Sequence, residues 1–582
     1  MSVAPAPTLP LPSLTEPAEP TPDDLESGPL DERFAELMLR LDESENAELY
    51  DAAKLASAAR RRGDVCLYLR SVTALHDGFS TRLLDTKVVG RPGEWKPLIL
   101  DQADRLYLHR YWRYEQELAS EIRTRLEMTS PELDRELLED GLNAFFDLAP
   151  NDQRAAAEKA LSGNFCVITG GPGTGKTRTV ARILALLWAQ SQCHGQRPSI
   201  ALAAPTGKAA ARMTESIRAA VAELRDKMDV AGVLEAEAVT LHRLLGTTPE
   251  NPTPRFDARN PLPIDAVIVD EASMIDLALM AKLFAAVPRT ARIILLGDKD
   301  QLASVEAGHV LGEICDRRPD RSEHPLTGRI AQLHRSFRFE PGSGIDRFSR
   351  SVNAGDVETA LEVLRSGSPE LTAKPLPSPE MLGRTLREKV VEGFRAALTA
   401  TDPAAALDAL NQFRILAAVR RGPYGVESLN ILASQALQEA GLLDSRGLFH
   451  HGRPVMILRN DYTLRLFNGD IGLILRDPES GDALRAFFQG PDGKVRRIAP
   501  SRLPEHETVW AMTVHKSQGS EFDRMLLILP DRETPLLTRE LLYTGITRAK
   551  RHGEIWYREE SLRKAIARRT ERTSGLADAL WA

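Results

Sequence analysis

The chain has 582 residues, of which 42% are hydrophobic and 27% are charged, and its formal net charge is −7 at pH 7. This length exceeds what one ordinary hydrophobic core accommodates, so we expect several domains. The acidic balance excludes a protein that coats nucleic acid by bulk charge and leaves open only a local basic groove. The lack of an apolar run of about 20 residues and of a secretory leader predicts a cytoplasmic protein without a membrane partner.

Four cysteines, Cys66, Cys166, Cys193 and Cys315, lie far apart in the chain and form no C-x-x-C pair. This spacing argues against a disulfide framework and against a zinc or iron–sulfur motif. We therefore interpret all four as reduced, structural residues.

The first part of the chain divides into a tail and a domain. Residues 1–30 are rich in Pro, Glu, Asp, Ser and Thr, which predicts a disordered tail. Residues 31–148 are expected to form a mainly helical N-terminal domain. Its first helix is expected to bury one apolar face, made of Phe34, Leu37, Met38 and Leu41.

Two further helices are expected at residues 50–62 and 103–128. Within the second, residues 106–115 combine aromatic and basic side chains. Such a segment suits either the binding of a partner or nucleic acid, or the packing of aromatic rings in a core. We find no catalytic cluster before residue 150.

A phosphate-binding loop begins after residue 165. Residues 165–169 are apolar and rich in β-branched side chains, which predicts a buried strand. The pattern G-x-x-x-x-G-K-T follows, and a helix is expected after it because apolar residues recur at i, i+3, i+4 and i+7. The loop consists of Gly170, Gly171, Pro172, Gly173, Thr174, Gly175, Lys176 and Thr177, and the helix face of Val180, Ile183, Leu184 and Leu187.

Each part of this loop has a chemical task. Glycines let backbone N–H groups converge on phosphate oxygens, and the start of the helix adds the positive end of a dipole. Lys176 is expected to reach the β- and γ-phosphates, and the Thr177 hydroxyl to ligate Mg²⁺. The sequence therefore predicts a nucleotide site that uses ATP and Mg²⁺.

Strands and helices alternate over residues 149–340, which predicts a parallel α/β sheet. Three more strands are expected at 199–204, 266–269 and 293–296, and polar residues follow each of them. Open α/β sheets bind ligands at the carboxyl ends of their strands. We therefore expect these polar residues to meet at the P-loop edge.

Two of these strand ends supply candidate catalytic groups. Asp270 is expected to hold Mg²⁺, and Glu271 to orient or deprotonate the attacking water. The Gln301 amide is suited to sensing a γ-phosphate. A two-metal nuclease site at Asp298 and Asp300 is an alternative, but a lone D-x-D is weak support for it, and no nuclease site is predicted.

A second α/β alternation occupies residues 341–582, with strands expected near 413–416, 525–529 and 555–557. Between them, short apolar runs and an Asn468-Gly469 turn predict a small SH3-like β-barrel inserted at about 446–505.

Together, the ordered motifs resemble those of superfamily 1 DNA helicases, and most closely the RecD family, the alpha subunits of exodeoxyribonuclease V (RecBCD). Besides the P-loop, the resemblance rests on 204–210, 270–273, 297–302, 336–339, 513–522 and 543–549, with support from 422–426, 459–461 and 466–472. It covers residues 150–560. It implies two RecA-like motor domains with ATP in the cleft between them, and DNA-stimulated ATP hydrolysis.

The resemblance also assigns roles at the nucleotide. Gln153 matches the helicase Q motif and would read the adenine. Arg338 and Arg548 would reach the γ-phosphate from the second domain, and such arginine fingers raise rates by about 10³–10⁵. Gln301 would link the nucleotide state to DNA.

Further motif residues are implied to hold single-stranded DNA during 5′-to-3′ translocation. Closure on ATP would bring the two grips together, and hydrolysis would release them. The resemblance implies DNA contacts at Thr206, Lys208, His242, Thr513, His515 and Ser517.

The implied setting is a heterotrimer with RecB-like and RecC-like subunits, acting on duplex and single-stranded DNA in double-strand-break repair by recombination and in degradation of linear duplex DNA. The N-terminal domain would dock onto a partner.

Two alternatives remain open. A freestanding RecD-like 5′-to-3′ helicase usually has a larger N-terminal region with helix–hairpin–helix elements, and no convincing Gly-containing hairpin pair precedes residue 150. A non-motor, nucleotide-binding structural subunit would not need the hydrolytic set of Lys176, Asp270, Glu271, Gln301 and Arg548.

Overall fold

The computed structural model describes residues 28–71, 78–128, 133–146, 151–224, 237–247, 251, 253–316, 323–444, 447–461, 463–490 and 493–581. Its contacts separate the described chain into two units. The P-loop unit contains residues up to 341 together with 570–581, and the second unit contains residues 342–569. The predicted tail lies outside the described residues except at its end, where Pro29 already starts a helix.

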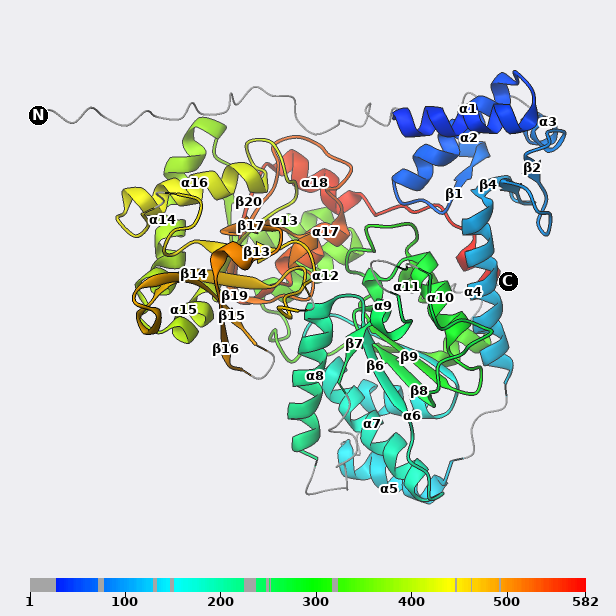
Figure 1. The fold of residues 1–582 in the computed structure, drawn as a ribbon, viewed down its shortest axis with the longest axis horizontal. Coiled ribbons are helices and arrows are strands. Elements are labelled where there is room, and N and C mark those ends of the chain that lie inside the picture. Colours follow the sequence, from blue (N-terminus) through cyan, green and yellow to red (C-terminus); the bar gives the residue numbers. More distant parts are fainter. Residues whose placement is uncertain are drawn as a thin grey trace, which may run out of the picture. The chain divides into compact units, whose positions relative to one another are not determined.

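The N-terminal part of the P-loop unit is helical, as predicted, but it also contains a small sheet of order β1-β4-β3-β2 (Figure 1). The predicted helix at 103–128 begins only at His109, because residues 105–108 pair with β1 and β3 instead. The elements are α1 (Pro29–Asp42), α2 (Ala47–Arg61), β1 (Cys66–Tyr68), α3 (Phe79–Leu84), β2 (Val89–Gly90), β3 (Leu98–Leu100), β4 (Arg105–Leu108) and α4 (His109–Glu127).

Helix α1 buries a different face from the predicted one. Leu37 and Leu41 are 40% and 50% exposed, although Met38 is buried as expected. The reason is polar: Asp31 is fully buried and accepts hydrogen bonds from Ser57 and from Arg61 of α2. This anchor turns the face with Asp31 and Met38 toward α2 and leaves the leucines outside.

The centre of the P-loop unit is a parallel six-stranded sheet of order β10-β5-β9-β8-β6-β7. The four predicted strands are all present. The strands are β5 (Phe165–Gly170), β6 (Ile200–Ala204), β7 (Val239–Thr240), β8 (Ala266–Val269), β9 (Arg292–Gly297) and β10 (Ile330–Leu333). The helices around it are α5 (Arg135–Phe145), α6 (Asp152–Leu161), α7 (Lys176–Gln192), α8 (Gly207–Ala222), α9 (Leu241–Leu244), α10 (Leu277–Ala286), α11 (Val310–Ile314) and α19 (Leu576–Trp581).

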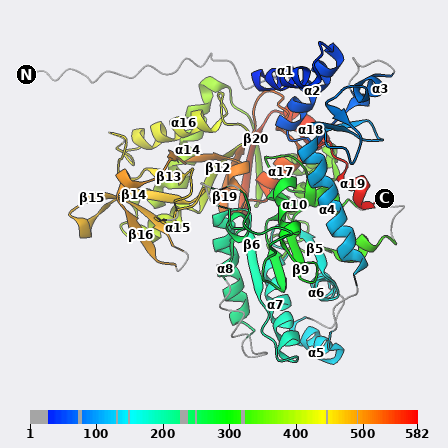
Figure 2. The same ribbon diagram turned by 45° about the vertical axis from the view of Figure 1, so that its right-hand side comes forward.

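Alternating side chains of the strands face two cores. Phe165 and Val167 pack with α4 and α10 on one face, whereas Cys166 and Ile168 pack with α6 and α7 on the other. The predicted apolar face of α7 is buried in the second core. Helix α4 runs beside α10, and α19 from the C-terminus joins the same core (Figures 1 and 2).

The second unit contains a parallel five-stranded sheet of order β11-β20-β19-β12-β18. Its strands are β11 (Leu371–Pro375), β12 (Phe413–Ala417), β18 (Ala511–Thr513), β19 (Phe522–Ile528) and β20 (Ala549–Tyr557). Its helices are α12 (Gly344–Ala354), α13 (Val357–Ser366), α14 (Pro379–Thr399), α15 (Pro403–Leu410), α16 (Val426–Glu439), α17 (Arg539–Ile546) and α18 (Glu559–Ala567). The predicted second domain therefore extends to residue 569, because residues 570–581 return to the P-loop unit.

An antiparallel sheet of order β16-β15-β14-β13-β17 is inserted between β12 and β18, close to the predicted position. Among the described residues, its edge strands pair only with β15 and β13, so closure into an SH3-like barrel stays a prediction. The strands are β13 (Pro454–Ile457), β14 (Ile471–Asp477), β15 (Ala483–Gln489), β16 (Val495–Ile498) and β17 (His506–Thr508).

Short 3₁₀ turns complete the chain: η2 (Leu69–Ser71), η4 (Ala272–Met274), η6 (Pro325–Arg329), η7 (Pro478–Ser480), η8 (Pro500–Arg502) and η9 (His515–Ser517). Among the helices of the described ranges, none combines the length and apolar character needed to cross a membrane.

Candidate nucleotide-binding site

The candidate site lies at the carboxyl edge of the six-stranded sheet. Because all six strands are parallel, the loops after them leave the sheet at this one edge. The P-loop follows β5, Asp270 and Glu271 follow β8, and Gln301 follows β9. The structure thus gathers the residues that the sequence predicted for nucleotide chemistry in the P-loop unit.

Glycine is required at two points of the loop. Gly173 and Gly175 have φ angles of +75° and +81°, which L side chains rarely adopt. A Cβ atom on Gly173 would lie 2.4 Å from the Arg338 Cβ, and one on Gly175 would lie 2.4 Å from the Gln153 Nε2. A side chain at either position would therefore close the cradle that the backbone forms.

Lys176 lies across its own loop. Its Nζ donates to the carbonyl oxygens of Gly170 at 2.5 Å and Gly171 at 3.1 Å. The Thr174 hydroxyl also donates to Gly171, and the Gln153 amide donates to the Thr174 carbonyl at 3.1 Å. The ammonium group is therefore held by carbonyl oxygens of the loop to which it belongs.

The acidic pair after β8 combines an unusual backbone at Glu271 with a raised pKa at Asp270. Glu271 has φ +51° and ψ 40°, a left-handed conformation that costs a non-glycine residue energy and is concentrated at functional sites. Burial, and then the neighbouring Glu271 charge, raise the pKa of Asp270 to about 6, whereas Lys176 and Arg212 oppose that rise. A cation beside Asp270 would relieve this electrostatic cost.

The turn after β9 explains the D-x-D carboxylates. Asp298 accepts hydrogen bonds from the Asp300 backbone at 3.1 Å and from the Gln301 amide at 3.1 Å, and Asp300 forms an ion pair with Lys299. These carboxylates hold a turn, so the nuclease alternative gains no support.

Two buried polar atoms at this edge have no hydrogen-bond partner within the described chain: Gln301 Oε1 and Ser273 Oγ. Gln301 is only 5% exposed. It follows β9, whereas Ser273 follows β8, and these two strands are neighbours in the sheet. Buried polar groups of folded proteins are normally paired. Unpaired ones at a ligand edge therefore fit a bound water or nucleotide group.

The donor set also fits Mg²⁺, which proteins usually hold through one or two oxygen ligands together with substrate phosphates. Thr177 supplies a hydroxyl at the start of α7, and Asp270 supplies a half-buried carboxylate. Within the described ranges there is no group of three or more His, Cys, Asp or Glu residues that could hold a metal without such phosphates.

The location implied for Arg338 is wrong. This residue lies in the P-loop unit, not in the second unit, and its backbone rests directly on the P-loop. The Phe337 N–H donates to the Gly173 carbonyl at 2.8 Å, and the Ser336 hydroxyl donates to the Pro172 carbonyl at 3.1 Å. The segment follows β10, which pairs with β5, and this pairing brings it to the loop.

Sequence reasoning missed Phe337. Its side chain is 62% exposed, and its ring lies near Gly175, on the side where Gln153 contacts the loop. An exposed aromatic ring beside a P-loop is suited to stacking on a base. The sequence feature that could have identified it is an aromatic residue between Ser336 and Arg338 in an otherwise polar stretch.

Arg548 is buried in the second unit, at 4% exposure. Its Nε donates to the Thr544 carbonyl at 3.0 Å, and one terminal nitrogen donates to the Ser520 carbonyl at 3.3 Å. These contacts fix the guanidinium between α17 and the segment that follows η9.

The predicted DNA-binding residues divide between the units. In the P-loop unit, Thr206 caps α8 by accepting from Ala209, Lys208 is half-buried, and His242 is exposed. These three residues follow β6 and β7, which are neighbours in the sheet.

In the second unit, Thr513 and His515 are half-buried at the end of β18. Ser517 is fully buried, and its hydroxyl donates to the Val514 carbonyl at 2.7 Å. The Ser517 hydroxyl thus closes the η9 turn, and its contact with DNA stays a prediction.

Comparisons with known proteins agree with this arrangement. A model of an AAA domain matches residues 153–307, and a model of the UvrD-like helicase C-terminal domain matches residues 508–552. The chain is 41% identical over 543 residues to the RecBCD enzyme subunit RecD of Mycobacterium tuberculosis, covering 90% of each chain. It is 38% identical over 563 residues to the subunit of that name from Mycolicibacterium smegmatis, covering 94% of this chain and 96% of the relative.

A further relative differs in extent. The ATP-dependent RecD2 DNA helicase of Deinococcus radiodurans is 31% identical over 463 residues, which cover 77% of this chain but only 54% of that protein. The chain thus matches the RecD subunits along nearly their whole length and the RecD2 helicase along about half of it.

Proposed function

Because the chain belongs to the RecD family of superfamily 1 DNA helicases, we propose that it is the 5′-to-3′ motor of a RecBCD-type complex that unwinds DNA ends for recombinational repair and degrades linear duplex DNA. Its catalysed reaction is DNA-stimulated ATP hydrolysis coupled to unwinding. One observation supports this most strongly: a single sheet edge combines the P-loop, an acidic pair with a strained backbone at Glu271, and a buried glutamine with an unpaired oxygen.

The chain's own groups divide the work at ATP. Lys176 leaves the Gly170 and Gly171 carbonyls and binds the β- and γ-phosphates, and Glu271 orients and deprotonates the attacking water. Mg²⁺ held by Thr177 and Asp270 would neutralise phosphate charge. Arg338 approaches the phosphates from the segment resting on the P-loop.

Two further groups recognise the base and complete the site. Gln153 reads the adenine while Phe337 stacks on it. Arg548, which lies in the second unit, acts as an arginine finger on the γ-phosphate in this proposal. Its present contacts with Thr544 and Ser520 then serve to orient the guanidinium.

DNA contacts come from the loops beyond β6 and β7 and from the end of β18. Lys208 supplies a positive charge and His242 a hydrogen-bonding group. Thr206 caps α8 and thereby positions Lys208 in its first turn. Thr513 and His515 do the same in the second unit, and Ser517 holds their turn in shape. Alternating affinity of the two grips through the ATPase cycle produces directional movement.

Docking of RecB-like and RecC-like subunits is supported by the outer face of α1. Leu30, Leu37 and Leu41 are 72%, 40% and 50% exposed, and their spacing of seven and four residues places them on one stripe of the helix. An exposed apolar stripe suits burial by another protein. The freestanding alternative is not favoured, since the RecD2 helicase has nearly half its length outside the match.

The test is to purify the tagged chain gently from its native cells, determine the mass of what accompanies it, and assay ATPase with and without single-stranded DNA. We expect one copy each of two larger proteins and ATPase that DNA stimulates and Lys176→Gln abolishes. Recovery alone with intact unwinding would favour a freestanding helicase. Absence of ATPase in the folded chain with DNA present would contradict the motor function.

A further inference from the structure

The end of the chain forms a strap, residues 570–581, whose contacts lie in the P-loop unit although it directly follows the second unit in sequence. The Thr573 N–H donates to Asp64 at 2.9 Å, and its carbonyl accepts from Val65 at 2.8 Å. The strap ends in α19, where Leu580 and Trp581 are buried in the core shared by α4 and the sheet. The P-loop unit thus incorporates both ends of the described chain.

Arg572 of the strap connects two segments of the P-loop unit. One terminal nitrogen donates to the carbonyls of Gly63 at 2.8 Å and Glu306 at 2.9 Å, and the other donates to Ser304 at 3.0 Å. Gly63 ends the turn after α2, whereas Ser304 and Glu306 lie in the loop that follows Gln301. The fit is close: a Cβ on Gly63 would lie 1.7 Å from an Arg572 nitrogen.

The loop after Gln301 also has other anchors: Leu302, Ala303 and Ala307 are buried, and the Ala307 carbonyl accepts from the Leu277 N–H at 3.1 Å. The Ser304 hydroxyl donates to the Glu306 carbonyl at 2.8 Å, and the Gly308 N–H donates to Gly63 at 3.0 Å. The Glu306 carboxylate pairs with Arg60 at 2.7 Å, but it is 64% exposed, so this pair contributes little. Among these anchors, Arg572 ties the Ser304 and Glu306 carbonyls to the strap.

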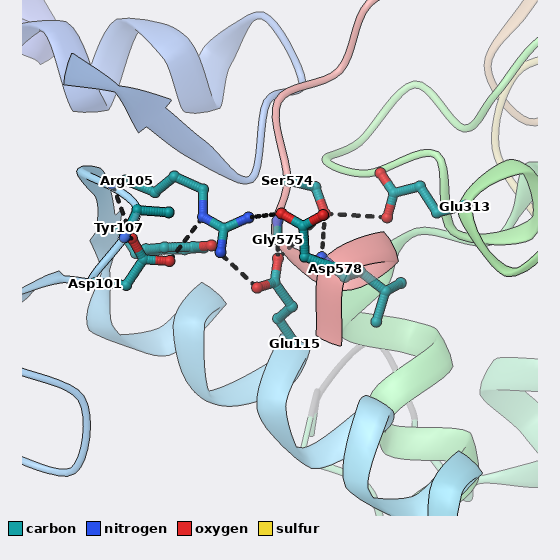
Figure 3. Close-up of polar contacts among 10 residues, drawn as sticks. Asp101, Arg105, Tyr107, Glu115, Glu313, Ser574, Gly575 and Asp578 are labelled. Atoms are coloured by element: carbon teal, nitrogen blue, oxygen red, sulfur yellow. Dashed lines mark hydrogen bonds and ion pairs between the residues drawn. The ribbon is translucent and has the colours of Figure 1, made fainter. Parts of the chain in front are cut away.

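The strap itself is locked by a buried polar network (Figure 3). The Ser574 hydroxyl oxygen lies 3.2 Å from a Glu115 oxygen and 3.0 Å from a Glu313 oxygen, and it accepts from the Leu576 N–H at 2.9 Å. Glu115 also accepts from the Gly575 N–H and the Tyr107 hydroxyl.

These contacts assign the protons. A hydroxyl has one hydrogen, so Ser574 can donate to only one of the two carboxyl groups. Burial raises the pKa of both Glu115 and Glu313, to about 8 for Glu313. Glu115 also accepts from the Gly575 N–H and the Tyr107 hydroxyl, which favours the anion at Glu115 and the proton at Glu313. The network is then fully satisfied, and such networks are rigid.

We propose that Arg572 is a positioning residue for ATP hydrolysis: through Ser304 and Glu306 it holds the loop that carries Gln301 at the sheet edge. The rigid strap supplies the fixed point, and the turn after α2 links the loop to the N-terminal, partner-docking part of the chain. This inference rests on the proposed role of Gln301 in coupling nucleotide to DNA.

The experiment compares Arg572→Ala, Arg572→Lys and Gln301→Ala in the purified complex, with Asp578→Ala as the matched control. Asp578 is a strap residue whose carboxylate pairs with Arg105 at 2.8 Å. The measurements are kcat and KM for DNA-stimulated ATPase, and hydrogen exchange of amides 298–308 without nucleotide and with ADP–aluminium fluoride.

For Arg572→Ala we expect a fall in kcat of about 10- to 100-fold, because small misplacements of catalytic groups have costs of this size. KM for ATP should stay within about twofold, as uniform binding is retained. Amide hydrogen exchange at residues 302–308 should be faster than in wild type without nucleotide, and ADP–aluminium fluoride should no longer change it. Arg572→Lys should lie between wild type and alanine, because one ammonium cannot fork across carbonyls of both segments.

Wild-type kcat and wild-type exchange in Arg572→Ala or in Arg572→Lys would overturn the proposal. If the alanine variant fails to fold, the lysine variant decides. Full activity of Gln301→Ala would instead contradict the role of Gln301, and exchange without nucleotide would still report whether Arg572 holds the loop.

Discussion

Buried polar groups are treated in opposite ways at two places in the P-loop unit. At the nucleotide edge, Gln301 Oε1 and Ser273 Oγ have no partner in the described chain, and Glu271 has a strained backbone. At the strap, the Ser574 hydroxyl makes three contacts, and Glu115 accepts from three donors once Ser574 is counted. The comparison indicates that the edge is kept open for a ligand, whereas the strap is closed for stability.

This contrast predicts that changes at the edge alter activity without altering stability. Lys176→Gln should lower ATPase by about 10²–10³-fold or more, because it removes a charged donor from the phosphates. The melting temperature should match that of Arg178→Gln, a control at an exposed residue two positions further along α7. The measurements are steady-state ATPase and thermal unfolding, and a large loss of stability would remove the distinction between the two places.

The converse holds at the strap. Glu115→Ala leaves the Tyr107 hydroxyl, the Ser574 hydroxyl and the Gly575 N–H without their acceptor. We therefore expect the free energy of unfolding to fall by roughly 3–5 kcal/mol, as when one partner of a buried ion pair is removed. Glu117→Ala on the same helix removes only an exposed pair with Arg113 and should cost about 0–0.5 kcal/mol. Melting temperatures and hydrogen exchange of residues 570–581 would test this, and equal effects of both variants would contradict it.

Phe337 provides a finer test of the open edge. Phe337→Ala should raise KM for ATP by roughly tenfold, because base–aromatic stacking is worth about 1–3 kcal/mol. Phe337→Tyr should restore KM, since the ring is kept, and kcat should change little in either variant. An unchanged KM in the alanine variant would exclude stacking.

Glu313 gives the smallest effect and a dependence on pH. Burial, and then the charge of Glu115, raise the pKa of Glu313 to about 8, against the contacts with Ser574 and the His309 backbone, with Asp316 adding to the rise. Because the pKa of Glu313 is higher in the folded than in the unfolded chain, protonated Glu313 stabilises the fold. This stabilisation is complete below the ordinary pKa of a glutamate and is lost as the pH rises toward 8.

Glu313→Gln keeps a donor for Ser574 without a titrating proton. The variant should equal or exceed wild type in melting temperature at pH 8 and above, and the difference should shrink toward pH 6. A variant that is less stable at every pH would show that Glu313 is charged in the fold.

Local patterns were enough to predict the nucleotide edge. The strand at Phe165, the apolar face of α7 and the polar residues after β8 and β9 all depend on short-range periodicity, and the structure has them as predicted. The roles of the individual residues remain proposals.

Features that depend on distant contacts could not be predicted in this way. The face of α1 is set by the buried Asp31, which pairs with the half-exposed Arg61 and overrides the leucine pattern. Arg338 lies on the P-loop because β10 pairs with β5, and Arg572 reaches Gly63 from the other end of the chain. No spacing in the sequence records such pairings.

The most direct test of the central claim is unwinding polarity. Duplexes with a 5′ or a 3′ single-stranded tail would be given to the purified complex, with either wild-type chain or Lys176→Gln. We expect the variant to lose unwinding that starts from the 5′ tail and to keep whatever starts from the 3′ tail. Equal unwinding of the 5′-tailed duplex by both complexes would contradict the account of this chain as an ATP-driven 5′-to-3′ motor.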